Sequence, residues 1–185
     1  MNKVILASGS PRRKELLSSL DIPFEVMASD IDESIDINAN LVDEIENLSF
    51  KKALAVFKDH KDKIVIGADT IVAYQNEVLG KPQTEKKAKE MLMNIQGDWH
   101  EVITGVTIIS SKQSETFSVV SNVHFYPMTV EEINYYISTK EPLDKAGAYA
   151  IQGIGSRYIK EIKGDYYSIM GLPIGELYHR IVKYL

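Results

Sequence analysis

Hydrophobic and polar positions follow one another along the chain in blocks with strand or helix periodicity. The apolar run 4–7 predicts a buried strand, and Leu16 and Leu17 lie on one side of the helix expected after Pro11. Ser10 is a good N-cap, and proline suits the first helical turn, where its missing N–H would have no partner. A strand that enters a helix through Ser-Gly-Ser directs backbone N–H groups at one spot that favours an anion.

The remaining blocks predict the other elements. They are strands over 24–28, 64–72, 99–109, 116–125 and 157–162, a turn at 75–76 leading to 78–79, helices over 40–59 and 173–185, a helix between Thr84 and Gly97, and a short helix from the capping box Thr129–Glu132. With 185 residues, of which 44% are hydrophobic, the chain can bury a core in one domain.

Two charged residues interrupt these apolar surfaces. Asp69 lies inside the β-branched run 64–72, where an unpaired carboxylate is costly to bury, so we expect it to have a role. Lys52 falls on the apolar face of the helix 40–59. Its stem either packs while its amine reaches water, or its ammonium enters a cleft to meet phosphate. Because lysine is rarely buried without a partner, the second interpretation is favoured.

Other charged and polar groups fit a phosphate and metal site but also have ordinary explanations. Arg12 and Arg13 stand in the first turn of a helix, where acidic residues are usual, and either form a phosphate pocket or are solvated. The acidic stretch 30–33, which includes Glu33, either holds a cation such as Mg²⁺ or is a surface loop. Gln152 can donate and accept, which suits the edge of a base, although the backbone can equally satisfy it. Lys81 would be unremarkable by itself.

Composition narrows the function classes. The chain has 26 acidic and 21 basic residues, which argues against a bulk nucleic-acid partner. It has no cysteine, which excludes disulfides, thiolate catalysis and cysteine-bound zinc. Its four histidines lack ligand spacing, and we expect His100 to form a structural hydrogen bond. No charged leader or membrane-length apolar run is seen, so we expect no membrane association and a cytoplasmic location.

The sequence resembles the Maf-type nucleoside triphosphate pyrophosphatases, also called septum formation inhibitor Maf proteins, nearly end to end. The motifs that carry this resemblance are Leu6-Ala7-Ser8-Gly9-Ser10-Pro11-Arg12-Arg13, Asp30-Ile31-Asp32-Glu33, Lys52-Ala53, Gly67-Ala68-Asp69-Thr70, Gly80-Lys81-Pro82, His100-Glu101-Val102-Ile103-Thr104-Gly105, Asp144-Lys145-Ala146-Gly147-Ala148-Tyr149, Ile151-Gln152-Gly153 and Gly171-Leu172-Pro173. The family commonly has glycine at Ala150 and asparagine at Ser168.

The resemblance implies an α/β fold, with one elongated two-lobed domain over residues 1–185, a mixed central sheet flanked by helices and an active cleft between the lobes. It implies metal-dependent hydrolysis of nucleoside triphosphates to a monophosphate and pyrophosphate, with removal of non-standard nucleotides as one use of that reaction. The paired arginines, Thr70 and Gln152 resemble the branch acting on dTTP and UTP, since the 7-methyl-GTP branch typically has an aromatic residue at Arg12.

The residues carried over fall into four groups. Catalytic roles are expected for Asp69 (the general base), Glu33, Lys52 and Lys81; phosphate binding for Ser8, Ser10 and Arg13; substrate specificity for Arg12, Thr70 and Gln152; and binding of Mg²⁺ or Mn²⁺ for Glu33 and Asp69. The expected partner is a small nucleoside triphosphate, and a homodimer is compatible with the sequence. Two alternatives stay open: a nucleotidyltransferase, and a nucleotide-binding regulator of cell division.

Overall fold

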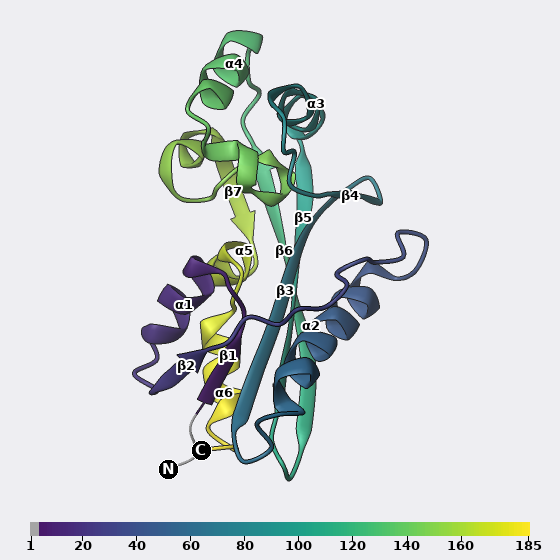
Figure 1. Cartoon of the computed structure of the whole chain (residues 1–185). Coiled ribbons are helices and arrows are strands. Elements are labelled where there is room, and N and C mark those ends of the chain that lie inside the picture. The colour runs from purple at the N-terminus through teal and green to yellow at the C-terminus, as the bar shows by residue number, and fades with distance from the viewer. Residues whose placement is uncertain (1–3) are drawn as a thin grey trace. The chain divides into compact units, whose positions relative to one another are not determined.

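The computed structural model describes residues 4–185 and is built on one seven-stranded sheet. The strand order is β2-β1-β3-β5-β6-β7, and β4 pairs with β3 (Figure 1). The strands are β1 (Val4–Ala7), β2 (Phe24–Val26), β3 (Ile64–Tyr74), β4 (Glu77–Leu79), β5 (Trp99–Ile109), β6 (Ser114–Phe125) and β7 (Ile159–Lys163). This mixed sheet with flanking helices confirms the predicted α/β fold class.

The α-helices are α1 (Pro11–Ser18), α2 (Leu41–Phe57), α3 (Glu85–Ile95), α4 (Val130–Ser138), α5 (Tyr166–Met170) and α6 (Ile174–Ile181). Three short 3-10 helices, η1 (Glu141–Asp144), η2 (Ala146–Ala148) and η3 (Gly153–Tyr158), follow α4. Among residues 4–185, no helix combines the length and the apolar character that crossing a membrane requires.

Most predicted elements are present, and the exceptions have simple causes. The second strand stops at Val26, two residues early. The last strand starts at Ile159, because residues 153–158 form the 3-10 helix η3. Helix α5 was not predicted, since its five residues are too short to show helical periodicity. The N-cap Ser10 and the capping box at Thr129 are confirmed, Thr84 caps α3, and Asn40, which was not predicted as a cap, caps α2.

The chain forms two compact units. Within the described residues, the first unit contains residues 4–70, Ile103–Val119 and Tyr167–Leu185. The second unit contains Ile71–Val102 and Val120–Tyr166. Strands β3, β5 and β6 contribute residues to both units. The predicted single domain over 1–185 and its cleft between lobes stay predictions.

In the first unit, β1 lies between β2 and β3, and both pairs are parallel. The chain passes from β1 through α1 to β2 on one side, and then through α2 to β3 on the other. The point at which the strand order reverses is therefore the carboxyl end of β1, which is where open α/β sheets bind their ligands. Ser8, the first residue after β1, stands at this point.

Helix α2 approaches the sheet very closely. A Cβ atom at Gly67 would lie 2.6 Å from the backbone nitrogen of Ala53, and one at Gly105 would lie 2.6 Å from the carbonyl oxygen of Ile45. Both positions must therefore be glycine for α2 to pack as it does. This packing buries Ala53 and Val56 against β1, β3 and β5.

The second unit holds a buried aromatic cluster around His100. His100 Nε2 and the Tyr149 hydroxyl are 2.8 Å apart, and Phe125 packs edge-on against both rings. Burial lowers the pKa of His100 to about 4, so the imidazole is neutral at neutral pH. The predicted structural hydrogen bond of His100 is confirmed.

Candidate functional site

The first unit brings three of the predicted catalytic residues together. Lys52 Nζ lies 2.6 Å from Asp69 Oδ1 and 2.9 Å from Glu33 Oε1. The Lys52 side chain is 7% exposed and that of Asp69 15%, whereas Glu33 is 60% exposed. The interpretation in which Lys52 reaches water is therefore wrong. Its ammonium forms ion pairs with two carboxylates, one of them largely buried, and its remaining N–H can still donate to an anion.

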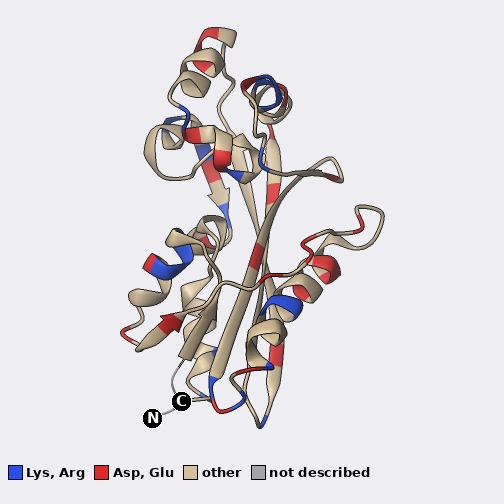
Figure 2. Ribbon diagram, in the orientation of Figure 1, with Lys and Arg blue, Asp and Glu red and all other residues tan. Residues whose placement is uncertain are grey.

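The close packing of α2 explains why Lys52 and Asp69 meet. Successive residues of a strand point to opposite faces, so Asp69 shares the face of Gly67, against which α2 packs. Lys52 is on α2 beside Ala53, the residue in contact with Gly67. Figure 2 shows the acidic position on β3 and the basic residues on α2 and at the start of α1.

Thr70 points to the other face of β3 and meets Arg13 of α1. Arg13 donates from a terminal nitrogen to Thr70 Oγ1 (3.0 Å), from the other to Ser8 Oγ (3.4 Å), and from Nε to the carbonyl oxygen of Gly171 (2.8 Å). Loss of hydration lowers the pKa of Arg13, and the carboxylate of Asp69 opposes that shift. A guanidinium has five N–H donors, so two remain for a ligand.

Two hydroxyl groups, hydrogen-bonded to each other, hold Arg13 in place. Thr104 donates its hydroxyl hydrogen to the carbonyl oxygen of Ser168 (2.7 Å), and Thr70 Oγ1 lies 2.8 Å from Thr104 Oγ1. Because the hydrogen of Thr104 is used, Thr70 must donate to Thr104, which leaves the oxygen of Thr70 to accept from Arg13. The bond from Thr104 to a carbonyl group therefore determines the direction of the hydrogen bond between the two threonines.

Thr104 belongs to one of the motifs that carry the family resemblance, but no role was predicted for it. The feature that could have indicated a role for Thr104 is its hydroxyl group in a buried strand, beside Gly105. A buried polar group needs a hydrogen-bond partner. The roles of the Ser168 and Gly171 carbonyl groups could not have been predicted, because every residue has a backbone carbonyl group and the residue type does not indicate which of them accepts a side-chain hydrogen bond. Ser168, where the family commonly has asparagine, is thus linked through its backbone to Arg13.

We expect Thr104→Val to weaken binding of inorganic triphosphate by roughly 5–10-fold, the equivalent of one neutral hydrogen bond of about 1 kcal/mol. Valine keeps the shape of threonine but cannot orient the hydroxyl of Thr70. Thr104→Ser should restore the wild-type affinity because it keeps the hydroxyl. Isothermal titration calorimetry measures the affinity, and equal affinities of the folded valine and serine variants would contradict the role of Thr104.

The turn between β1 and α1 contains Ser8 and Ser10. Ser8 Oγ accepts from the Ser10 amide (3.2 Å) and from Arg13, and Ser10 Oγ caps the helix by accepting from the Arg13 amide (3.4 Å). Ser8 is 7% exposed and its hydroxyl hydrogen can donate to a phosphate oxygen. The amide and hydroxyl of Ser10 both serve the turn, so phosphate binding by Ser10 stays a prediction.

Arg12 differs from its neighbour. Within residues 4–185 its guanidinium forms no hydrogen bond or ion pair, although Arg13 beside it forms three hydrogen bonds. The two arginines therefore differ: the protein holds the Arg13 guanidinium in place, whereas the N–H donors of Arg12 have no partner among the described residues.

The other two predicted site residues, Lys81 and Gln152, belong to the second unit. Lys81 is exposed in the loop after β4, where the carbonyl oxygen of Gly80 accepts from the amide of Gly147 (3.3 Å). Gln152 is exposed just before η3, in extended backbone. The structure thus brings eight of the ten predicted residues into the first unit and leaves these two in the second.

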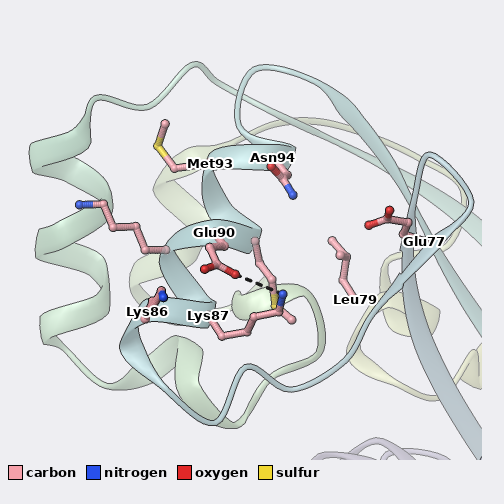
Figure 3. Close-up of a pocket in the computed structure, with 9 residues that line it drawn as sticks. Glu77, Leu79, Lys86, Lys87, Glu90, Met93 and Asn94 are labelled. Carbon is pink, nitrogen blue, oxygen red and sulfur yellow. Dashed lines mark hydrogen bonds and ion pairs between the residues drawn. The ribbon is translucent and has the colours of Figure 1, made fainter.

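A separate open pocket of about 600 Å³ lies between β4 and α3 in the second unit (Figure 3). Its lining includes Lys86 and Met93, and Lys87 pairs with Glu90 across 3.2 Å. None of the predicted site residues lines it. The pocket is therefore not the site that the sequence predicts.

Comparisons with known proteins identify relatives of this chain. A dTTP/UTP pyrophosphatase of Bacillus mycoides is 50% identical over 184 residues, covering 100% of this chain and 96% of the relative, and one of Bacillus cereus matches to the same extent. The Ham1 protein of Staphylococcus aureus has a similar fold, with a TM-score of 0.52, 12% identity and full coverage of both chains. The family model described as Maf-like protein matches residues 3–184. This chain therefore belongs to the Maf family.

Proposed function

We propose that this chain is a dTTP/UTP pyrophosphatase, which hydrolyses these nucleotides to the nucleoside monophosphate and pyrophosphate. The relatives that match the full chain at 50% identity carry that name. The single observation that most supports the chemistry is the Asp69–Lys52–Glu33 group, where a carboxylate with a buried cationic partner stands next to a second carboxylate.

In the proposed reaction, water attacks the α-phosphorus, the bond between the α-phosphorus and the bridging oxygen breaks, and pyrophosphate leaves. Asp69 Oδ1 is bonded to Lys52, so its other oxygen is the one that can take a proton from water. Arg13 and Lys52 hold cationic donors toward the charge that develops on the phosphates. Lys81, predicted to be catalytic from the family resemblance, would add a further cation.

Glu33 and Asp69 are suited to holding a divalent cation. Their side chains supply oxygen ligands, which Mg²⁺ and Mn²⁺ prefer, and a shared bond to Lys52 holds them close together. Residues 4–185 contain no group of three His, Cys, Asp or Glu side chains able to bind a metal. Water and substrate phosphates would therefore complete the coordination, as is usual for Mg²⁺. When bound, the cation would neutralise phosphate charge.

For specificity, we propose different roles for the three predicted residues. Gln152 and Arg12 are free to contact the base: uracil and thymine present two carbonyl groups flanking N3–H, which an amide and a guanidinium can match. Thr70 accepts from Arg13 and donates to Thr104, so it would act by holding Arg13 in place. Cytoplasmic location, a homodimer and removal of non-standard nucleotides stay predictions from the sequence.

The test is turnover of dTTP, UTP, CTP, ATP and GTP with separate detection of monophosphate and pyrophosphate. We expect UTP and dTTP to exceed the others in kcat/KM by roughly tenfold or more, because a site that bonds to a substrate group rejects an analogue lacking it, while one methyl group matters less. Arg12→Ala and Gln152→Ala should flatten this preference.

Lys14→Ala, which removes an exposed cation from the same helix as Arg12, is the matched control and should leave the preference unchanged. Equal turnover of all five nucleotides would overturn the specificity. Release of inorganic phosphate, or transfer of the nucleotide to an alcohol, would overturn the reaction itself. Binding without turnover would instead favour a regulator.

A further inference from the structure

In the second unit, two side chains outside the predicted site hold the segment that carries Gln152. Glu141 Oε1 accepts from the Gly155 amide (2.9 Å), and Glu141 Oε2 accepts from the Ile154 amide (3.0 Å). The Tyr136 hydroxyl donates to Glu141 Oε1 (2.8 Å) and accepts from the Ala150 amide (3.1 Å). The backbone is thus fixed on both sides of Gln152.

The glycines of this segment allow it to wrap around the two side chains. A Cβ atom on Gly153 would lie 2.5 Å from Glu141 Oε2, and Gly153 has a φ of +78°, which other residues rarely adopt. A Cβ atom on Gly155 would lie 2.5 Å from the Tyr136 hydroxyl. Both glycines are therefore required for Glu141 and Tyr136 to reach the backbone.

The protonation states of Glu141 and Tyr136 suit the hydrogen bonds that these two side chains form. Burial disfavours the charged form of Glu141, but hydrogen bonds from Gly155, Ile154 and Tyr136 outweigh this and lower its pKa. Burial raises the pKa of Tyr136, which keeps its hydroxyl hydrogen. Tyr136 is fully buried, so its hydroxyl has a fixed position in the core. An ionised acceptor and a neutral donor are what this arrangement of hydrogen bonds needs.

We propose that Glu141 and Tyr136 are positioning residues for base recognition, which act by fixing the backbone on both sides of Gln152. The hydrogen bonds of this network do not involve the side chain of Gln152. The network therefore fixes the backbone from which that side chain extends, and it leaves the side-chain amide available to contact the base. This inference rests on the proposed function, in which Gln152 reads a pyrimidine edge.

The test compares Tyr136→Phe and Glu141→Gln with wild type in kcat/KM for UTP and for CTP. Phenylalanine keeps the buried ring but loses both hydrogen bonds, and glutamine keeps the shape of glutamate but places an NH₂ group where an N–H donor must be accepted. We expect the UTP:CTP ratio to fall roughly 5–10-fold in each variant, with the affinity for inorganic triphosphate unchanged. Tyr135→Phe is the matched control, because Tyr135 is the 51% exposed neighbour on α4.

A double-mutant cycle separates positioning from general damage. In a Gln152→Ala background, Tyr136→Phe should cause no further change in the UTP:CTP ratio, because the group that it positions is gone. If Tyr136→Phe fails to fold, Gly153→Ala provides a second variant, since its Cβ would push the segment away from an intact Glu141. Its expected effect on the ratio is the same.

An unchanged ratio in a folded variant, or an equal loss of rate with every nucleotide and with inorganic triphosphate, would overturn the positioning role. These results differ from failure of the proposed function, which would appear as absence of UTP hydrolysis in wild type. If wild type prefers UTP and the Glu141 and Tyr136 variants keep the wild-type UTP:CTP ratio, this inference alone is overturned.

Discussion

Turnover of UTP and dTTP should fall to background when a chelator removes free divalent cations, and should return when Mg²⁺ or Mn²⁺ is added in excess. A triphosphate that approaches Asp69 also approaches Glu33, and Lys52 already shares its charge between these two carboxylates. The cations of the site are therefore insufficient to neutralise both the protein and the substrate. A divalent cation held by Glu33 and Asp69 would neutralise phosphate charge and so offset this repulsion.

The chelator should not unfold the protein. Lys52 holds the two carboxylates together without a metal, so the melting temperature in the absence of nucleotide should be the same with and without chelator. Steady-state assays across a range of cation concentrations measure the effect. Full turnover in chelator, after nucleotide and protein have been stripped of metal, would overturn the assignment of Glu33 and Asp69 as metal ligands.

The elements around the site were predictable because each depends on short-range signals. The strand before Ser8, the cap at Ser10 and the proline after it are local, and they determine where α1 begins. The apolar face of α2 and the β-branched residues of β3 are equally local. Each of Lys52 and Asp69 was therefore identified by itself, as a charge on an apolar surface.

The pairing of these residues was not predictable in the same way. Lys52 meets Asp69 because α2 contacts β3 at Gly67, and that contact depends on where two distant segments pack. The same reason hid Thr104, whose role depends on Thr70 from a neighbouring strand. It also hid Glu141, which lies in no periodic pattern and binds a segment 13 and 14 residues further along the chain. A residue type indicates that a partner is needed; only the fold identifies the partner.

Asp69→Asn should lower kcat for UTP by roughly 10²-fold or more while the protein stays folded. Asparagine has nearly the shape of aspartate, but its amide is not a base and cannot take a proton from water. Of the two carboxylates on Lys52, Asp69 is the more buried, and a general base gains from a position from which bulk water is excluded. Binding of inorganic triphosphate should change far less than kcat, because Lys52 and Arg13 remain.

The structure also gives this variant a stability effect. The ammonium of Lys52 is nearly buried, and loss of the charge on Asp69 leaves the exposed Glu33 as its one charged partner within residues 4–185. We therefore expect the free energy of unfolding to fall by about 1–3 kcal/mol. Glu33→Gln is the matched control: it removes the exposed carboxylate, so its stability should stay within about 1 kcal/mol of wild type. It should mainly raise the cation concentration needed for half-maximal rate.

Assays well below the melting temperature of each variant, with urea unfolding measured in parallel, separate the loss of a base from loss of folded protein. Two results would support Asp69 as the base: a low kcat in folded Asp69→Asn that high cation concentration does not restore, and a kcat of Glu33→Gln that recovers at high cation concentration. A folded Asp69→Asn protein with a near-normal kcat would move the base elsewhere. Glu33, the other carboxylate bonded to Lys52, would then be the first residue to test in that role.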